Sequence, residues 1–264
     1  MGRCAYHVLR DRRHVARRNV RRIFPAMSRR QVDQIVLSCL QKLGINFMEI
    51  LRFPYLKKEE YTERFALRGI EHARGALAEG RGILALVFHY ANWEIMGVAS
   101  YILQNEVVTL ARPLKHRDRL NAFLNQLRTA TGLTVIPNRD TAKDVIRLLR
   151  ENRIVALLGD QREKRSKAVW VEFFSEKVPT SKGVVMLGMK TGVPVIPVYA
   201  VREGFLRYTI VFNRPLEIER KGAPVDELIY RNARRVNAFL EGLVSANPDE
   251  WLLVHRRWGS KRAS

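Results

Sequence analysis

The chain has 264 residues, with 47 Lys and Arg against 26 Asp and Glu, and its formal net charge at pH 7 is +21. Apolar residues make up 47% of it and charged residues 28%, so it can bury the core of one α/β domain or of two small ones. These values exclude a disordered chain, a collagen-like chain and a small disulfide scaffold. The excess positive charge predicts an anionic partner, which can be nucleic acid, an anionic membrane surface, an acidic carrier protein or a phosphorylated small molecule.

The first thirty residues concentrate this charge, because residues 1–30 contain ten arginines and one acid, Asp11. Apolar side chains recur among the arginines at nearly helical spacing, at Leu9, Ala16, Val20, Ile23 and Phe24. The pattern predicts a basic amphipathic helix that ends at Pro25. Such a helix suits an anionic membrane interface, although an arginine-rich face that is solvated or bound to nucleic acid has the same pattern. We therefore predict a membrane-interface segment at residues 1–30 and a single further domain at 31–264.

From residue 31 onwards the apolar pattern predicts two helices, at 32–43 and 61–77, and then an alternation of strands and helices. Strands are predicted at residues 83–88, 107–110, 133–136, 154–158, 193–200 and 206–212, and helices at 92–103, 118–129, 141–149, 181–190 and 225–244. The last strand directly follows Gly204, which predicts a hairpin and an antiparallel edge. This order indicates an α/β fold, a mixed, mainly parallel sheet flanked by helices, with ligands bound beyond the carboxyl ends of the strands.

Cysteine and hydropathy patterns bear on the cellular setting. Cys4 and Cys39 make no disulfide framework, and neither they nor the six histidines show a metal-ligand spacing, so we expect a reducing environment and no catalytic metal. The longest apolar stretch, at 184–201, is interrupted by Lys190, Thr191 and two prolines, and is not expected to span a bilayer. The amino-terminal segment lacks the apolar region of a secretory signal.

The sharpest local feature is His89, which follows the buried apolar run at 83–88 and precedes Glu94 by five positions. A helix that starts at Asn92 places Glu94 in its first turn, from which the carboxylate can fold back toward the imidazole. A carboxylate bonded to one ring nitrogen fixes the tautomer and leaves the other nitrogen as a base. A structural role accounts for the pair about as well, with a hydrogen-bonded histidine at a strand end and an acid favoured by the helix dipole.

Several arginines are expected at the same end of the sheet. Arg112 follows a predicted strand and Arg128 lies late in the next helix, and a guanidinium group binds phosphate with two hydrogen bonds. Taken alone, Arg128 is better explained as a surface charge. Arg256 and Arg257 either meet lipid phosphate or close the domain.

Asp160 and Gln161 follow the predicted strand at 154–158, so they also fall on the ligand side of the sheet. There they either contact substrate or form a turn with side-chain hydrogen bonds. His255 lies among tryptophans and is better explained as structural. Five apolar residues either line a channel for a long apolar substrate or belong to the core: Val87, Ile95, Met96, Leu103 and Met186.

The stretch FHYANWE at 88–94 resembles the signature of the lipid A biosynthesis acyltransferases, the lauroyl and myristoyl transferase family, in which a His, four residues and an acid define the active site. Further similar blocks extend over nearly the whole chain in the same order: RNVRRIFPAMS ending at Ser28, ARP at 111–113, LRTATG at 127–132, GDQ at 159–161, VEFFSEKVPTSKG at 171–183 and NPDEWLLVHRRW at 247–258. Two departures stand out. The family usually has Gly where Ala91 stands, and its members usually begin with a hydrophobic anchor, so attachment here is expected through the basic helix or an upstream portion.

The resemblance implies a fold like that of the glycerolipid acyltransferases and a role for each matching residue. His89 and Glu94 would be catalytic, with His89 taking the proton from an acceptor hydroxyl and Glu94 orienting the imidazole, an arrangement that contributes typically ~10²- to 10⁴-fold in rate. Substrate binding is expected at Asn92, Arg112, Arg128, Asp160, Gln161 and Arg256. The hydroxyl would attack the fatty thioester directly, because the chain has no GxSxG motif and no suitable Cys-His pair.

The resulting hypothesis is a bacterial acyltransferase at the cytoplasmic face of the inner membrane. It would move a fatty acyl chain from acyl carrier protein to a hydroxyl of a lipid A precursor or related glycolipid, with no metal or cofactor besides the acyl donor and with no nucleic acid as partner. Relatives in the family use acyl-CoA or acylate mannosylated phosphatidylinositol, and both remain alternatives. A second class is a non-enzymatic basic protein that binds membrane or nucleic acid, in which substitution of His89 or Glu94 would have no effect on acyl transfer.

Overall fold

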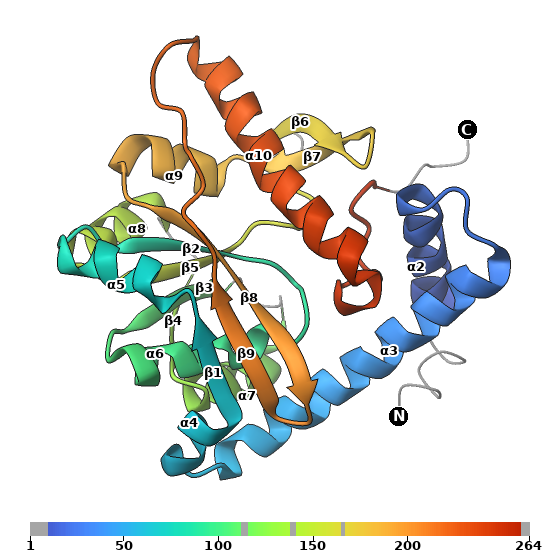
Figure 1. The fold of residues 1–264 in the computed structure, drawn as a ribbon, viewed down its shortest axis with the longest axis horizontal. Helices are drawn as coiled ribbons and strands as arrows, with labels where there is room; N and C mark the ends of the chain where they lie inside the picture. Colours follow the sequence, from blue (N-terminus) through green and yellow to red (C-terminus); the bar gives the residue numbers. More distant parts are fainter. Residues whose placement is uncertain (1–9, 112–115, 138–140, 165–166, 260–264) are drawn as a thin grey trace.

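A computed structural model describes residues 10–111, 116–137, 141–164 and 167–259. Its centre is a seven-stranded sheet in the order β1-β9-β8-β2-β5-β3-β4 (Figure 1). The strands are β1 Phe65–Arg68, β2 Ile83–Val87, β3 Val107–Ala111, β4 Leu133–Pro137, β5 Ile154–Leu158, β8 Val195–Gly204 and β9 Arg207–Phe212. Five of them run parallel, and β9 and β1 run the opposite way. The predicted mixed, mainly parallel sheet is confirmed.

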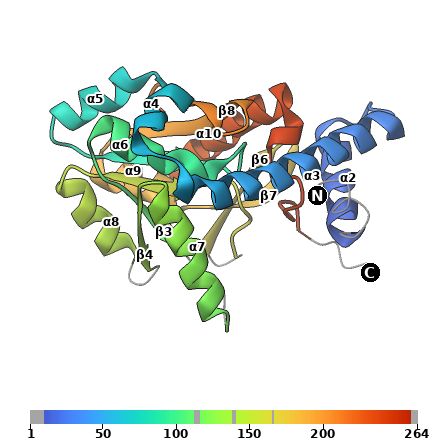
Figure 2. The ribbon, with the colours of Figure 1, turned by 90° about the horizontal axis from the view of Figure 1, so that it is seen from below.

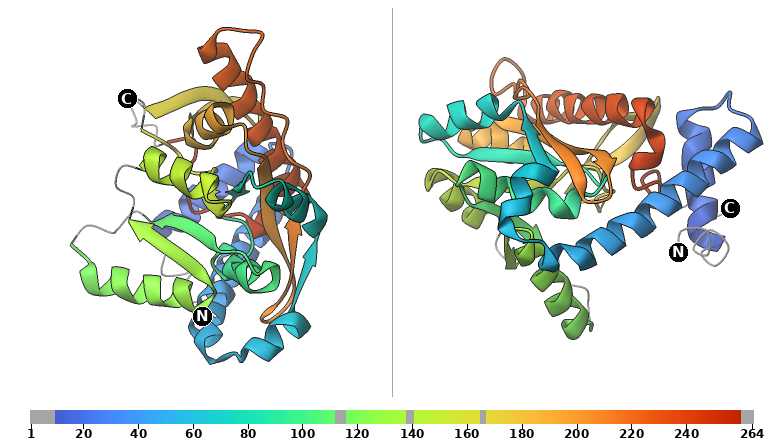
Figure 3. Two further views of the ribbon diagram at one scale, coloured as in Figure 1. Left: turned by 90° about the vertical axis from the view of Figure 1, so that its left-hand side faces the viewer. Right: turned by 60° about the horizontal axis from the view of Figure 1, so that its bottom comes forward.

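Helices precede, connect and follow these strands, except that a hairpin joins β8 to β9. The α-helices are α2 Arg10–Ile23, α3 Arg29–Arg52, α4 Tyr61–Arg64, α5 Ile70–Ala78, α6 Val98–Leu103, α7 Asp118–Ala130, α8 Thr141–Arg150, α9 Gly183–Thr191 and α10 Val225–Ala246. Short 3-10 helices are η1 Phe53–Tyr55, η2 Lys58–Glu60, η3 Trp93–Gly97 and η5 Pro248–Glu250. Figures 2 and 3 show α7 and α10 on opposite sides of the sheet, with α7 projecting from the body.

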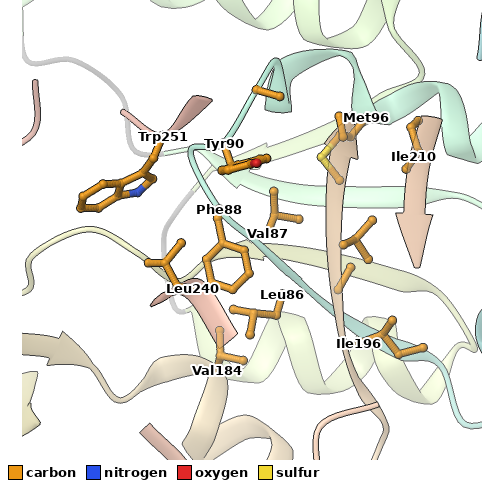
Figure 4. Packing of buried hydrophobic residues seen from close by; sticks show 14 of the residues in the cluster. Leu86, Val87, Phe88, Tyr90, Met96, Val184, Ile196, Ile210, Leu240 and Trp251 are labelled. Atoms are coloured by element: carbon orange, nitrogen blue, oxygen red, sulfur yellow. The ribbon is translucent and has the colours of Figure 1, made fainter. Parts of the chain in front are cut away.

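The core forms on both faces of β2, whose five residues are all buried, as the continuous apolar run predicted. Leu86 and Phe88 point toward α10, where Phe88 lies near Leu240 and stacks on Phe239 (Figure 4). The opposite face of β2, with Ala85 and Val87, is covered by η3, α6 and α7. The two faces of one strand are therefore packed by different layers of helices, and the carboxyl end of β2 emerges between them.

Two predictions for the sheet were wrong. The sequence predicted one helix over 61–77, but β1 lies between α4 and α5 and pairs in parallel with β9. Gly69 follows β1 with φ +72°, a conformation that ends the strand and that β-carbon-bearing residues rarely adopt. The predicted hairpin of β8 and β9 is present, but β1 takes the edge position that the prediction gave to β9.

A second sheet was not predicted. It is the antiparallel hairpin of β6 Ala168–Phe173 and β7 Glu176–Ser181, which packs against α10. Its two-residue turn is formed by Phe174 and Ser175, both with positive φ. Such turns normally carry Asn or Gly, so Phe174 and Ser175 carry no recognisable turn signal.

The basic amino-terminal helix is present as α2, followed by Pro25 as predicted. Its apolar face is buried inside the protein, against α3 and the carboxyl-terminal segment, with Ala16 and Val20 at 0% exposure. This face is therefore not available to insert into a bilayer, which corrects the simplest form of the interface prediction. Contact of its arginines with a membrane stays a prediction. Among the described residues, no helix is long and apolar enough to cross a membrane.

Candidate active site

His89 and Asp160 meet because β2 and β5 are neighbouring parallel strands. Val87 pairs with Leu158 in register, and the backbone N–H of Gly159 donates to Val87 O at 2.9 Å. Both chains leave the sheet at the same level, and the imidazole Nδ1 of His89 lies 2.7 Å from Oδ1 of Asp160. The backbone N–H of His89 donates to Oδ2 of the same carboxylate at 2.9 Å. The pair is thus fixed through side chain and backbone together.

The surroundings of Asp160 keep it ionised. Burial alone would raise its pKa, but the charge of His89 and the hydrogen bonds from His89 and Trp251 outweigh burial and lower the pKa to about 2. The indole Nε1 of Trp251 donates to Oδ2 at 2.9 Å. An ionised Asp160 accepts the Nδ1 proton of His89, which leaves Nε2 as the basic ring nitrogen.

The Nε2 atom of His89 faces the side-chain amide of Gln161, whose Nε2 lies 3.0 Å away. Gln161 is exposed and His89 is almost buried, so Gln161 lies at the solvent edge of the site. The ring of His89 also packs edge-on against Trp93 of η3, with ring centroids 4.7 Å apart. Asp160 and Gln161, which the sequence placed on the ligand side of the sheet, both contact the imidazole directly.

Glu94 has a different partner from the one expected. Its two carboxylate oxygens accept hydrogen bonds from Nε and Nη2 of Arg128, at 2.8 and 2.9 Å. The acid hydrogen-bonded to His89 is therefore Asp160, and the prediction that Glu94 orients the imidazole is corrected on this point. The physical reason is that Arg128 presents a planar pair of donors from α7 that matches a carboxylate. Both side chains are about one-quarter exposed, and the pair raises the pKa of Arg128.

An apolar cavity of about 160 Å³ lies beside this ion pair, between the sheet and the layer of η3, α6 and α7. Glu94, Arg128 and Trp93 are among its lining residues. The others come mainly from one face of the sheet and from the helices over it: Ala85, Val87, Met96, Ala99, Val107, Thr109, Leu110, Ala111, Leu133, Ile154, Ala156, Leu158, Val198 and Phe212. Protein cavities of this size hold small apolar molecules.

Five residues had been named for an apolar channel, and two of them, Val87 and Met96, line this cavity. Ile95 is fully buried in the core and Leu103 is partly buried against it, while Met186 is 51% exposed on α9.

The turn that carries His89 into η3 is held from behind by α3. Ala91 has φ +50°, the left-handed conformation that favours glycine. Its N–H donates to Glu250 O at 2.8 Å, and its carbonyl accepts a hydrogen bond from Nδ2 of Asn46 at 2.6 Å. Hydrogen bonds to two other segments of the chain therefore hold the turn in this conformation, as a strained backbone at a functional site requires.

Glu49, one helical turn after Asn46, completes this support. Its carboxylate is 0% exposed and accepts hydrogen bonds from Asn92 Nδ2, Tyr208 Oη, Leu206 N and Arg202 Nη1, at 2.9, 2.6, 2.9 and 2.7 Å. Burial, the largest effect, and the nearby Glu49 charge both raise the pKa of Tyr208. Asn92 was predicted to bind substrate, but its amide is buried and turned toward α3.

Two further arginines were predicted to bind substrate. Arg112 lies outside the described residues, and Arg256 is exposed. Arg257 is fully buried and donates to Pro179 O, Thr180 Oγ1, Asn237 Oδ1 and Gln161 O. This residue closes the domain by joining the carboxyl-terminal segment to β7, α10 and the loop after β5, which was one of the two readings of its sequence.

Sequence reasoning missed three residues of this region: Trp251, Asn46 and Glu49. From the sequence, Trp251 was expected to surround His255 in a structural role, and its hydrogen bond to Asp160 was not predicted. Asn46 and Glu49 do carry a signal, because a polar residue and an acid one turn apart interrupt an otherwise apolar helical stretch. The sequence does not indicate which buried partner they meet.

The fold is an α/β fold consistent with that of an acyltransferase. Residues 1–260 match the family model of the bacterial lipid A biosynthesis acyltransferases, and the chain belongs to this family. A lipid is therefore among its substrates.

Three similar proteins from bacteria illustrate the range of the family. The chain is 22% identical to the lipid A biosynthesis palmitoleoyltransferase of Escherichia coli K12 and 22% identical to its lauroyltransferase, in both cases over 99% of this chain and 83% of the relative. It is 27% identical to the phosphatidylinositol mannoside acyltransferase of Mycolicibacterium smegmatis, over 92% of this chain and 78% of the relative.

Proposed function

We propose that this acyltransferase moves a fatty acyl chain from acyl carrier protein to a hydroxyl of a lipid A precursor or a related glycolipid, with His89 as general base. The observation that carries the proposal is the hydrogen bond between Nδ1 of His89 and Asp160, at the carboxyl ends of two neighbouring parallel strands. Trp93, which packs on the His89 ring, lines an apolar cavity. The bond supplies a correctly protonated base, and the cavity supplies space for part of an acyl chain.

The reaction proceeds by direct attack. The acceptor hydroxyl takes the place of the Gln161 amide at Nε2 of His89, and its proton moves to that nitrogen as its oxygen bonds to the thioester carbonyl carbon. Asp160 stabilises the imidazolium that forms. The tetrahedral intermediate collapses with cleavage of the carbon–sulfur bond, and the leaving thiolate takes the proton from the imidazolium, which restores His89.

In this scheme Glu94 acts through Arg128. The ion pair uses Nε and Nη2 of the guanidinium and fixes it at the wall of the cavity. A positive charge held there stabilises the negative charge that develops on the thioester oxygen, or holds a phosphate of either substrate. Glu94 and Arg128 therefore remain functional residues in this scheme, and neither of them orients the imidazole of His89.

Electrostatics favours the acidic carrier protein as donor. The net charge of +21 accelerates encounter with an acidic partner and with the cytoplasmic face of an anionic inner membrane. Acyl-CoA is the alternative donor, and the relative from Mycolicibacterium smegmatis makes a mannosylated phosphatidylinositol the alternative acceptor.

The test combines genetics and reconstitution. Mass spectrometry of lipids from a strain lacking the protein should show one glycolipid species lighter by one acyl group. The purified protein should restore that group faster from acyl carrier protein than from acyl-CoA. An unchanged lipid profile together with no transfer from either donor would reject the proposal, and faster transfer from acyl-CoA would reassign the donor.

A further inference from the structure

A groove of about 440 Å³ lies on the outer side of α2, away from its buried apolar face. We call it the arginine groove; its lining residues are His14, Arg17, Arg18, Arg21, Arg22 and Arg29. All but Arg29 come from α2, and Arg29 is the first residue of α3. Figure 1 shows these two helices side by side, with α2 next to the carboxyl-terminal segment.

Five guanidinium groups and one imidazole line the arginine groove. Within the described part of the chain, Arg17 pairs with Asp33 at 2.5 Å and Arg22 with Glu176 at 3.2 Å. Nε of Arg18 and Nη1 of Arg22 are buried, and neither has a hydrogen-bond partner among the described residues. These buried atoms are out of reach of a bound anion, which would accept instead from the exposed guanidinium groups of Arg21 and Arg29.

The groove belongs to the same end of the molecule as His89. Arg18 donates to the carbonyl of Gly259 at 3.3 Å, and the Arg22 guanidinium lies over the ring of Trp258 at 5.6 Å. The segment that contains both residues also contacts the site, because the N–H of Leu252 donates to His89 O at 2.9 Å. A group held in the groove therefore lies near the same carboxyl-terminal segment that contacts His89.

We propose that the arginine groove binds a phosphate group of a lipid headgroup. Phosphate oxygens match the forked donors of guanidinium groups, and several such groups converge on one concave surface. Because the apolar face of α2 is buried, the helix meets lipid through this groove and not by insertion. The inference rests on the proposed function only in taking the lipid to be a substrate or its membrane.

The experiment compares two double variants with equal loss of charge. Arg21→Gln with Arg29→Gln removes two exposed arginines of the groove, and Arg10→Gln with Arg30→Gln removes two exposed arginines outside it. Binding of the full chain to phosphatidylcholine vesicles containing phosphatidic acid is measured by co-sedimentation at constant ionic strength. We expect the groove pair to weaken binding about tenfold or more and the outer pair to weaken it less than about threefold.

Two outcomes would overturn the proposal. Equal weakening by both pairs would mean general attraction to a charged surface, and unchanged binding in the groove pair would mean that the groove is not used. A titration with inorganic phosphate separates the sources of the ligand: phosphate alone should bind at least tenfold more weakly than the vesicles, and equal affinity would reject a lipid headgroup. None of these measurements requires turnover, so their failure is distinct from failure of the proposed reaction.

Discussion

The carboxylate of Asp160 accepts the Nδ1 proton of His89 at 2.7 Å, although 71 positions separate the two residues. Trp251 donates to the same carboxylate at 2.9 Å, so three segments of the chain converge on one acid. This arrangement makes Asp160, and not Glu94, the partner that sets the tautomer of the base.

Substitution of Asp160 tests this assignment. In Asp160→Asn the amide can donate to Nδ1, which moves the ring proton to Nε2 and removes the base. We expect kcat to fall by about 10²- to 10⁴-fold with little change in KM. Steady-state kinetics with Asp226→Asn, an exposed acid on α10, as the matched control checks this. A kcat for Asp160→Asn close to that of the control would show that the imidazole does not need this carboxylate.

The Glu94–Arg128 ion pair predicts strong non-additivity. If Glu94 acts through Arg128, then Glu94→Gln, Arg128→Gln and the double variant should lose similar amounts of kcat/KM, because each removes the same unit. A double-mutant cycle measures the coupling. If the loss of kcat/KM in the double variant equals the product of the two single losses, Glu94 acts independently of Arg128. That result is expected if Glu94 orients His89 directly.

Because Ala91 has a left-handed backbone conformation, we expect its replacement by glycine and by valine to have different effects on stability. Ala91→Gly removes a backbone strain of about 1 kcal/mol, which the greater entropy of an unfolded glycine partly offsets, so we expect stability to be unchanged or slightly higher. Ala91→Val places a β-branched residue at φ +50° in a buried site and should lower the free energy of unfolding by more than 2 kcal/mol. Urea denaturation of both variants provides the comparison. A larger loss for glycine than for valine would show that backbone conformation is not what limits this position.

His255 predicts how stability depends on pH. Burial lowers its pKa from 6.5 to about 4, so the unfolded chain binds a proton between these values while the folded chain does not. Its contribution to stability is fully present above pH 6.5 and is lost as the pH falls toward 4, by about 3 kcal/mol at most.

Unfolding of His255→Gln checks this prediction. The variant should have a flatter stability curve between pH 6.5 and 4 than the wild type. Identical slopes in the two proteins would mean that His255 titrates alike in the folded and unfolded chain.

Most of the large sheet was predictable because its parallel strands are continuous apolar runs, as in β2, which is buried on both faces. The same logic placed His89 and Asp160 at strand ends. It did not make them partners, because the sequence does not say that β5 inserts between β2 and β3. Glu94 is close to His89 along the chain, but the strand order brings Asp160 closer in space.

Short elements escaped prediction for a different reason. β1 has four residues and depends on pairing with β9, so its local pattern is weaker than that of the helices beside it. The turn of the β6–β7 hairpin has positive φ at Phe174 and Ser175, neither of which is a typical turn residue, and the N–H of Phe174 donates to Glu241 Oε1 at 2.8 Å. The burial of the apolar face of α2 inside the protein could not be predicted either. An amphipathic pattern shows that a helix covers something apolar, but not whether that is lipid or protein.

Acyl transfer by purified His89→Ala tests the general-base role of His89, with folding checked by circular dichroism and vesicle binding measured in parallel. We expect kcat to fall by about 10²-fold or more with native folding and unchanged vesicle binding, because the base that removes the hydroxyl proton is gone. Transfer at the wild-type rate by a folded His89→Ala protein would contradict this role.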